Sequence, residues 1–194
     1  MIKIKKENIN NCNNNIYGDW INKKIKPELS PFSYVIINNF LNNEIYEKIN
    51  KEFPNQPDNT WWKYNNPLEV KYANDNINNF KTNTKNLFNS LSSDKIINKM
   101  KEIFNIPNLE YDPYCHGDGL HMHPRNGRLN IHLDYEIHPY SKKKRRLNII
   151  LYMNEEWNKE WNGDTQLWNE NVSECVVKSH VKFNRAVIFQ TNEI

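Results

Sequence analysis

The sequence predicts an α+β fold that is mainly β, with short strands in a sandwich or small barrel and helices packed on one side. Two observations lead to this prediction. Before Pro107, apolar residues recur at helical spacing in two segments; after it, short alternating segments are separated by turn residues. The chain has 194 residues, of which 38% are hydrophobic, so it can form one domain with a sizeable core.

The chain begins with a polar stretch over residues 1–30, for which we predict a loosely held N-terminal arm. The apolar run over residues 32–40 is typical of a strand. Three aromatic residues follow in a loop bounded by prolines, and we interpret them as packing residues: Trp61, Trp62 and Tyr64.

Two helices are predicted in the first half, each by apolar residues that recur on one face. The first begins near Asn42 or Asn43, either of which can cap it, and its inward face carries Ile45, Ile49 and Phe53. The second covers residues 94–104 after a serine cap, and its inward face carries Ile96, Met100 and Ile103 or Phe104.

Short strands separated by turns are predicted in the second half. They lie near residues 109–115, 128–135, 145–153, 164–168, 174–178 and 183–191.

The predicted strand over 128–135 carries the most informative motif, His132-Leu133-Asp134. Side chains of a strand alternate between its faces, so apolar residues point one way and Asn130, His132 and Asp134 the other. An imidazole and a carboxylate two residues apart can reach the same ion, and such a pair supplies two ligands of the facial triad of non-haem iron oxygenases. By spacing alone, a strand histidine bonded to an aspartate on a solvated face is an equal alternative.

A second His-x-Asp occurs at His116-Gly117-Asp118. Pro113 and Gly119 flank it and the segment does not alternate, so it is typical of a turn. We therefore predict a metal site at the later copy only.

The predicted strand over 145–153 also alternates, with one face packed against the core: Leu147, Ile149, Leu151 and Met153. Asn148 and Tyr152 lie on the other face, which we place on the side of His132. A phenol there can donate a hydrogen bond to a carboxylate, and the alternative is a core tyrosine with its hydroxyl at the rim.

Charge and cysteine content limit the classes of partner. The net charge of +3 and the isoelectric point near 8.6 are too mild to indicate a nucleic acid or a membrane. Three widely spaced cysteines without a Cys-x-x-Cys indicate reduced thiols: Cys12, Cys115 and Cys175. No signal peptide or membrane span is apparent, so we expect a cytoplasmic protein without a membrane partner.

Several motifs, taken in order, resemble one family. Residues 151–154, Leu-Tyr-Met-Asn, and the tryptophan-rich run to Trp168 resemble a segment of 2-oxoglutarate- and Fe(II)-dependent dioxygenases of the prolyl 4-hydroxylase-like group. The segments at 119–121, 127–130 and 183–189 and the strand at 32–40 resemble the same group. Asn162 stands where that group has the first glycine of a Gly-Gly pair, and Asn tolerates left-handed backbone.

The resemblance implies a double-stranded β-helix, or jelly roll, preceded by helices. It implies one oxygenase domain over residues 31–194, with helical support over 31–108 and the jelly-roll core over 109–194. The distal histidine ligand and the Arg or Lys that pairs with 2-oxoglutarate would follow residue 194. We therefore expect a C-terminally truncated domain that lacks its last strand or strands, binds iron weakly and is inactive alone.

The resemblance also implies the site chemistry. Fe(II) would bind His132 and Asp134, and the co-substrate 2-oxoglutarate would bind Tyr152 and Asn148, with ascorbate as a reductant. Conversion of 2-oxoglutarate to succinate and CO₂ would accompany hydroxylation of a C–H bond. Around the pair, Asn130 would orient a ligand, and His121 would lie near the substrate or cosubstrate pocket.

The substrate stays open between a peptidyl, prolyl-type group and a small molecule, as does the oligomeric state. A cupin-like metal protein with the pair His121-x-His123 is an alternative, but a cupin glutamate does not follow that pair. A nucleic-acid demethylase is a second alternative, suggested by the basic run over 142–146, which is more typical of a solvated loop. A non-enzymatic jelly-roll module is a third.

Overall fold

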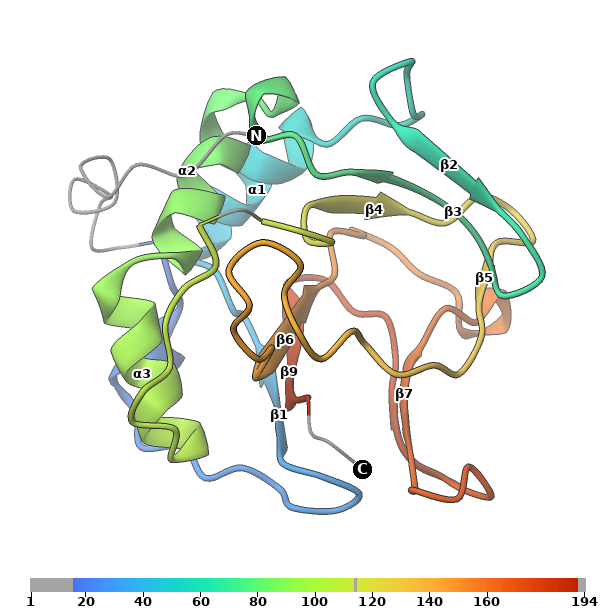
Figure 1. Ribbon diagram of the computed structural model, residues 1–194. Coiled ribbons are helices and arrows are strands. Elements are labelled where there is room, and N and C mark those ends of the chain that lie inside the picture. Colours follow the sequence, from blue (N-terminus) through green and yellow to red (C-terminus); the bar gives the residue numbers. More distant parts are fainter. Residues whose placement is uncertain (1–15, 114, 192–194) are drawn as a thin grey trace.

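The computed structural model describes residues 16–113 and 115–191. Three helices lie to one side of a mainly antiparallel β structure (Figure 1). The helices are α1 (Asn43–Glu52), α2 (Thr82–Leu91) and α3 (Asp94–Phe104). The predicted mixed, mainly β class is therefore confirmed, whereas the jelly roll stays a prediction.

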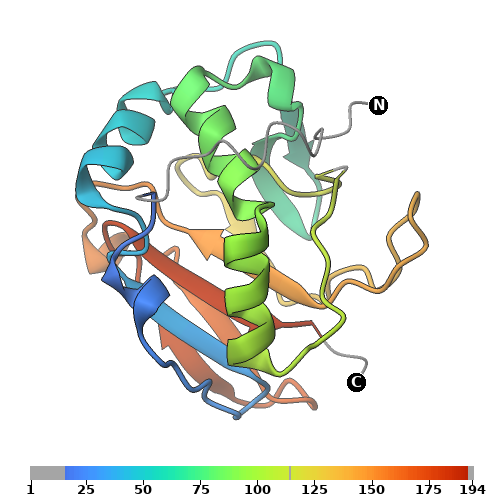
Figure 2. The same cartoon turned by 90° about the vertical axis from the view of Figure 1, so that its left-hand side faces the viewer.

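The sheet next to the helices has the order β1-β9-β6. Its strands are β1 (Tyr34–Asn38), β9 (Arg185–Gln190) and β6 (Leu147–Leu151). β9 is central and antiparallel to both neighbours, and its residues Ala186, Val187 and Ile188 are fully buried. The helices pack on one face of this sheet (Figure 2). Early and late parts of the chain thus share one core.

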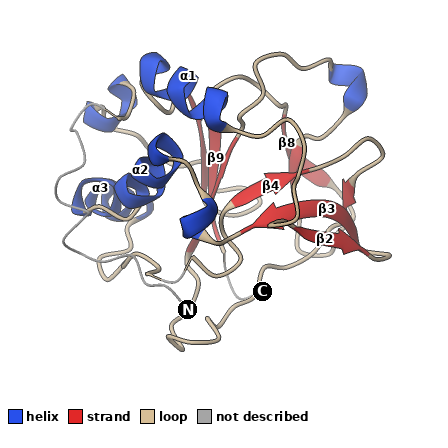
Figure 3. Cartoon of the chain, turned by 90° about the horizontal axis from the view of Figure 1, so that it is seen from above, coloured by secondary structure: helices blue, strands red, loops and turns tan. Residues whose placement is uncertain are grey.

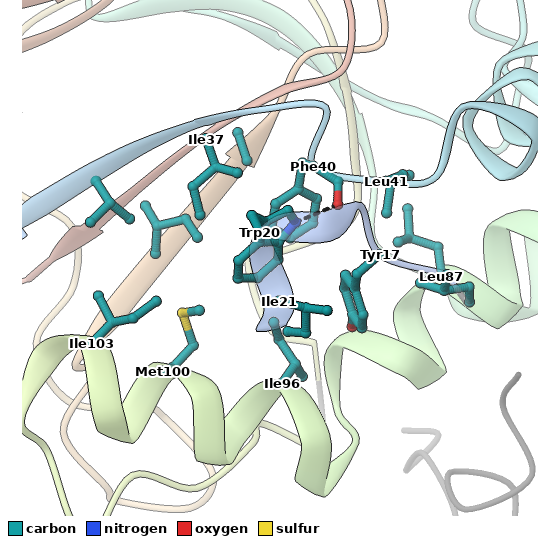
Figure 4. Close-up of a cluster of buried hydrophobic side chains, with 14 of the residues drawn as sticks. Tyr17, Trp20, Ile21, Ile37, Phe40, Leu41, Leu87, Ile96, Met100 and Ile103 are labelled. Carbon is teal, nitrogen blue, oxygen red and sulfur yellow. Dashed lines mark hydrogen bonds between the residues drawn. The ribbon is translucent and has the colours of Figure 1, made fainter. Parts of the chain in front are cut away.

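The helices follow the sequence prediction in two cases out of three. In α1 the side chain of Asn42 accepts a hydrogen bond from the Glu44 amide at 2.9 Å, as expected of an N-cap. In α3 the predicted inward residues are buried, and Figure 4 shows Ile96, Met100 and Ile103 pointing into the core. α2 was not predicted, because its Asn- and Thr-rich sequence has low helix propensity.

The core includes residues from the predicted polar arm. Ile16, Tyr17, Trp20 and Ile21 are buried, and Trp20 Nε1 donates to the Phe40 carbonyl at 2.7 Å (Figure 4). The Trp20 and Phe40 rings stack at 5.0 Å between centroids. Residues 16–21 therefore differ from the arm expected over 1–30, because two aromatic and two isoleucine side chains suffice to anchor the segment in the core. The earlier part of that arm lies outside the described residues.

A second sheet lies on the other side of the molecule from the helices (Figure 3). It has the order β2-β3-β4, and β5 also pairs with β3. Its strands are β2 (Trp62–Asn65), β3 (Glu69–Asn74), β4 (Leu120–Met122) and β5 (Arg128–Leu129). The predicted loop at Trp62 is therefore a strand, and the interpretation of Trp62 as a packing residue is wrong because its side chain is 67% exposed.

The strand predicted over 109–115 is also wrong, since the described residues there form turns and irregular backbone. The last predicted strands are confirmed in β7 (Thr165–Trp168), β8 (Cys175–Ser179) and β9. β7 and β8 form a separate antiparallel pair.

Asn162 has a φ of 57°, which agrees with the left-handed backbone expected in place of glycine. Among the described helices, none has both the length and the apolar character to cross a membrane.

Candidate metal centre

The His132-Leu133-Asp134 segment lies between β5 and β6, in irregular backbone. β5 ends at Leu129, so the strand predicted over 128–135 is wrong beyond that residue. Its apolar side chains reach solvent, since Ile131 is 50% and Leu133 is 72% exposed. Within the described residues no strand pairs with 130–135, and an extended segment without a partner has no ladder to hold its register.

His132 and Asp134 nevertheless converge. His132 Nε2 lies 3.6 Å from Asp134 Oδ1. Two ligand atoms that bind the same metal ion at about 2.1 Å each can lie at most about 4.2 Å apart. The observed separation therefore lets both atoms reach one ion. The irregular backbone between the two residues therefore brings their side chains together without the regular strand that the sequence predicted.

The His132 ring is held by the backbone of Asn130. Nδ1 lies 2.8 Å from the Asn130 carbonyl oxygen, and because a carbonyl only accepts, Nδ1 carries the hydrogen. The Nε2 lone pair then faces Asp134, which is the tautomer that a metal-ligating histidine needs. Asn130 thus contacts His132 through its main chain, while its side chain donates to the Pro67 carbonyl at 3.3 Å.

The second carboxylate oxygen of Asp134, Oδ2, has partners of its own. Asn148 Nδ2 donates to Asp134 Oδ2 at 3.0 Å, and Arg145 Nη2 lies 4.0 Å from the same oxygen. The expectation that Asn148 lies on the side of His132 is therefore confirmed. With Oδ2 occupied, Oδ1 remains for the position shared with His132 Nε2.

Electrostatics favour a cation between the two groups. The Asp134 carboxylate, 3.6 Å from Nε2, outweighs desolvation and raises the pKa of His132 above its ordinary value, because it favours a proton on that nitrogen. Burial opposes ionisation of Asp134, but the nearby His132 ring and the Arg145 charge outweigh it and lower the pKa of that carboxyl. Either a proton or a metal ion can fill this position.

The residues present fit part of an iron site. A neutral imidazole with its other nitrogen bonded to a carbonyl, next to a hydrogen-bonded carboxylate, is a donor set that suits non-haem Fe(II). Within residues 16–113 and 115–191 no group of three His, Cys, Asp or Glu side chains is arranged to hold a metal. The described residues therefore offer two candidate ligands, both from one segment.

Comparison with known proteins supports the same chemistry. Residues 119–194 match the model of the 2OG-Fe(II) oxygenase superfamily. No curated protein matches the chain. The matched stretch contains both residues of the candidate pair as well as Asn148 and Tyr152. The mixed, antiparallel architecture is consistent with an oxygenase fold, and the match supports dioxygenase-type chemistry with Fe(II) and 2-oxoglutarate.

The other His-x-Asp lies just before the matched oxygenase stretch and forms a turn, as predicted. Asp118 N–H donates to the Cys115 carbonyl at 3.3 Å, and Gly117 has a φ of 73°. The His116 ring packs against the Tyr135 ring at 5.4 Å between centroids. Its environment is thus aromatic.

Tyr152 directly follows β6, and its hydroxyl joins three strands. It accepts from the Thr165 amide at 2.9 Å, lies 2.7 Å from Thr165 Oγ1, and donates to the Ser179 carbonyl at 3.0 Å. The side chain is 8% exposed. These bonds cross-link β6, β7 and β8, and the expected contact of Tyr152 with 2-oxoglutarate stays a prediction.

His121 lies on β4, opposite Ala73 of β3. Surrounding protein atoms and the neighbouring Lys71 charge lower the pKa of His121 to about 4, so the imidazole is neutral at pH 7. Desolvation and Lys71 also lower the pKa of His123. The cupin alternative gains no support within the described residues, because these two histidines are in no three-residue metal group. The pocket role of His121 stays a prediction.

Sequence reasoning missed Arg145 as a neighbour of the site. It lies in the basic run over 142–146, three of whose members form ion pairs with acidic side chains. Lys143 pairs with Glu110, Lys144 pairs with Glu136 at 3.2 Å, and Arg145 lies between two aspartates. The nucleic-acid alternative stays open, and no spacing pattern in the sequence indicates these contacts.

Proposed function

We propose that this chain carries the iron-binding pair of a 2-oxoglutarate-dependent oxygenase that hydroxylates a C–H bond. The observation that carries the proposal is the convergence of His132 Nε2 and Asp134 Oδ1 at 3.6 Å within the stretch that matches the oxygenase family. The fixed ring tautomer and the held carboxylate support it further.

Each residue around the pair has a definable task. Bound Fe(II) would supply activation of oxygen coupled to oxidative decarboxylation of 2-oxoglutarate. His132 and Asp134 would be two of its ligands. The Asn130 carbonyl fixes the imidazole, and the Asn148 amide fixes the carboxylate.

For the cosubstrate, we propose that the Tyr152 hydroxyl contacts the distal carboxylate of 2-oxoglutarate, with Asn148 beside it and ascorbate as the external reductant. Tyr152 lies four residues after Asn148, directly beyond the strand that carries Asn148 toward Asp134. The Tyr152 hydroxyl would then exchange one of its present partners for the carboxylate. His121 would line the same pocket.

For the substrate, we propose a peptidyl, prolyl-type group or a small molecule, as in the prolyl 4-hydroxylase-like group. Trp62 and Tyr64 are 67% and 38% exposed, and alternation places both on one face of β2. The register pairs them with Ala73 and Lys71, and Ala73 in turn with His121. An aromatic surface of this kind suits an apolar ring.

We further propose one cytoplasmic domain over 31–194 without a membrane or nucleic-acid partner.

The test is a metal titration with matched histidine variants. Anaerobic calorimetry measures Fe(II) affinity for the wild-type chain, His132→Ala and His116→Ala. We expect His132→Ala to lose more than the roughly 10–100-fold that removal of a residue supporting a ligand costs. His116→Ala should stay within about twofold of wild type, because its ring packs among aromatic side chains.

A succinate-release assay with 2-oxoglutarate then compares the same proteins for turnover. Equal losses in the two histidine variants would overturn the assignment of the site. Fe(II) affinity that is unchanged in His132→Ala would overturn the proposed function itself.

A further inference from the structure

The segment between Asp134 and β6 forms a hairpin over residues 136–145. A loop before β6 stands out from the body of the molecule (Figure 2, orange). Arg145 N–H donates to the Glu136 carbonyl at 2.7 Å and closes the base of this hairpin. Ile137 and Lys144 form a β-bridge next to it. The position of Arg145 is therefore set by the hairpin.

His138 anchors the hairpin to the rest of the chain. This residue is 5% exposed, and its Nδ1 accepts from the Tyr140 and Ser141 amides, both at 3.1 Å. The hydrogen is then on Nε2, which lies 3.2 Å from Asp112 Oδ2. Asp112 comes shortly before the His116-Gly117-Asp118 turn. The hairpin thus docks on the segment that contains the second His-x-Asp.

Arg145 connects the two His-x-Asp motifs. Its Nη2 lies 3.7 Å from Asp118 Oδ1 and 4.0 Å from Asp134 Oδ2, and the side chain is 12% exposed. The guanidinium lies over the Tyr135 ring, 4.8 Å from its centroid. The Tyr135 hydroxyl in turn donates to the His116 carbonyl at 2.8 Å. Two carboxylates and one aromatic ring therefore restrict the position of the Arg145 guanidinium.

We propose that Arg145 is a positioning residue for Asp134, and that the His116-Gly117-Asp118 turn holds Arg145 in place through Asp118. The guanidinium cannot lose its proton and attracts the Asp134 Oδ2 that also accepts from Asn148, so that Oδ1 stays aimed at His132 Nε2. The second His-x-Asp thus supports the metal pair and does not itself bind metal. The proposal rests on the proposed function for the identity of the pair.

The first readout is Fe(II) affinity by anaerobic titration of the full chain. Arg145→Met should weaken binding by about 10–100-fold, the range for loss of a group that orients a ligand. Asp118→Asn should weaken binding in the same direction. In the Arg145→Met background the second substitution should add little, because residues that act through one another are not additive.

The second readout needs no metal. Hydrogen exchange of the amides over 130–135 in the iron-free protein should become faster in Arg145→Met and Asp118→Asn, because Asp134 is less constrained. The matched control is Lys144→Met on the same hairpin. Its ion pair with Glu136 involves side chains that are 53% and 50% exposed, so neither readout should change.

The outcomes separate the two proposals. Faster exchange over 130–135 together with weaker Fe(II) binding supports the positioning role. Unchanged exchange in Arg145→Met overturns it, even if the melting temperature falls. If the wild-type chain binds no Fe(II), the proposed function fails, and the exchange measurement alone still decides whether Arg145 positions Asp134.

Discussion

At the scale of single residues, one hydrogen bond can decide what a side chain is able to do. The Asn130 carbonyl fixes the tautomer of His132, and the Asn148 amide fixes the carboxylate of Asp134. Neither contact requires a regular strand. Both candidate ligands are therefore held in place although the backbone between them is irregular.

Tyr152 gives a residue-scale prediction. Tyr152→Phe leaves the Thr165 amide and the Ser179 carbonyl without their present partner in a buried position. We expect the free energy of unfolding to fall by about 1–3 kcal/mol, measured by urea denaturation. If the hydroxyl also contacts 2-oxoglutarate, the affinity for that cosubstrate should fall by roughly tenfold or more.

The control for this prediction is Tyr64→Phe. Tyr64 is 38% exposed, so water can take the place of its hydroxyl as a hydrogen-bond partner. That variant should keep both the stability and the 2-oxoglutarate affinity of wild type. A Tyr152→Phe protein as stable as wild type would show that the three-strand cross-link contributes nothing measurable.

At the scale of secondary-structure elements, α1 supplies the cap that α2 lacks. The N-cap position of α2 is Lys81, whose side chain makes no capping bond. Glu52 at the end of α1 does so instead. Its carboxylate accepts from the amides of Asn83 and Thr84 at 3.0 and 2.8 Å, and from both of their side chains. Two of the otherwise unpaired amides of α2 are thereby satisfied.

Removal of this interaction gives the second prediction. Glu52→Ala should lower the free energy of unfolding by about 1–2 kcal/mol, the cost of a lost N-cap. Urea denaturation at neutral pH measures it. Glu47→Ala on the exposed face of the same helix is the control and should change stability by less than about 0.5 kcal/mol.

The Glu52 contribution should also depend on pH. Desolvation opposes ionisation, but the hydrogen bonds from Asn83 and Thr84 outweigh it and lower the pKa of Glu52 below its ordinary value. A lowered folded pKa means that the stabilisation is present above the ordinary value and is lost as the pH falls through the folded one. The difference between wild type and Glu52→Ala should therefore shrink between about pH 6 and about pH 3. A difference that stays constant would contradict this account.

At the scale of the whole molecule, a buried side-chain amide joins an early segment of the chain to a late one. Asn184, just before β9, is fully buried. Its Nδ2 donates to the Leu41 carbonyl at 2.8 Å, and its Oδ1 accepts from the Leu41 amide at 2.9 Å. These two bonds satisfy the backbone of Leu41, which lies just before α1 and is itself fully buried.

The third prediction follows from that link. Asn184→Ala leaves two buried backbone groups of Leu41 unpaired and should lower the free energy of unfolding by about 2–4 kcal/mol. Part of the loss is local, because Asn184 has a φ of 52°. Asn39→Ala measures that local part, since Asn39 is exposed and has a φ of 51°. Equal losses in the two variants would show that the amide bonds do not stabilise the fold.

Local sequence was sufficient to predict an element wherever the pattern of apolar and polar residues along it decides its structure. Apolar periodicity predicted α3 and its buried side chains, and alternation placed Asn148 on the side of Asp134. Turn-forming residues indicated the bend at His116-Gly117-Asp118. Spacing of two residues was enough to bring His132 and Asp134 within reach of one ion, whatever the backbone between them does.

Tertiary structure decided what depends on partners far away in the chain. α2 has weak propensity and takes its cap from Glu52, and β3 (Glu69–Asn74) is held between β2 and β4. Arg145 lies near two aspartates, at positions 118 and 134, only because the hairpin brings it there. The sequence by itself determined the candidate pair, His132 and Asp134, because the two residues are local. Folding decided which groups contact the pair, because contacts between distant segments leave no periodic trace in the sequence.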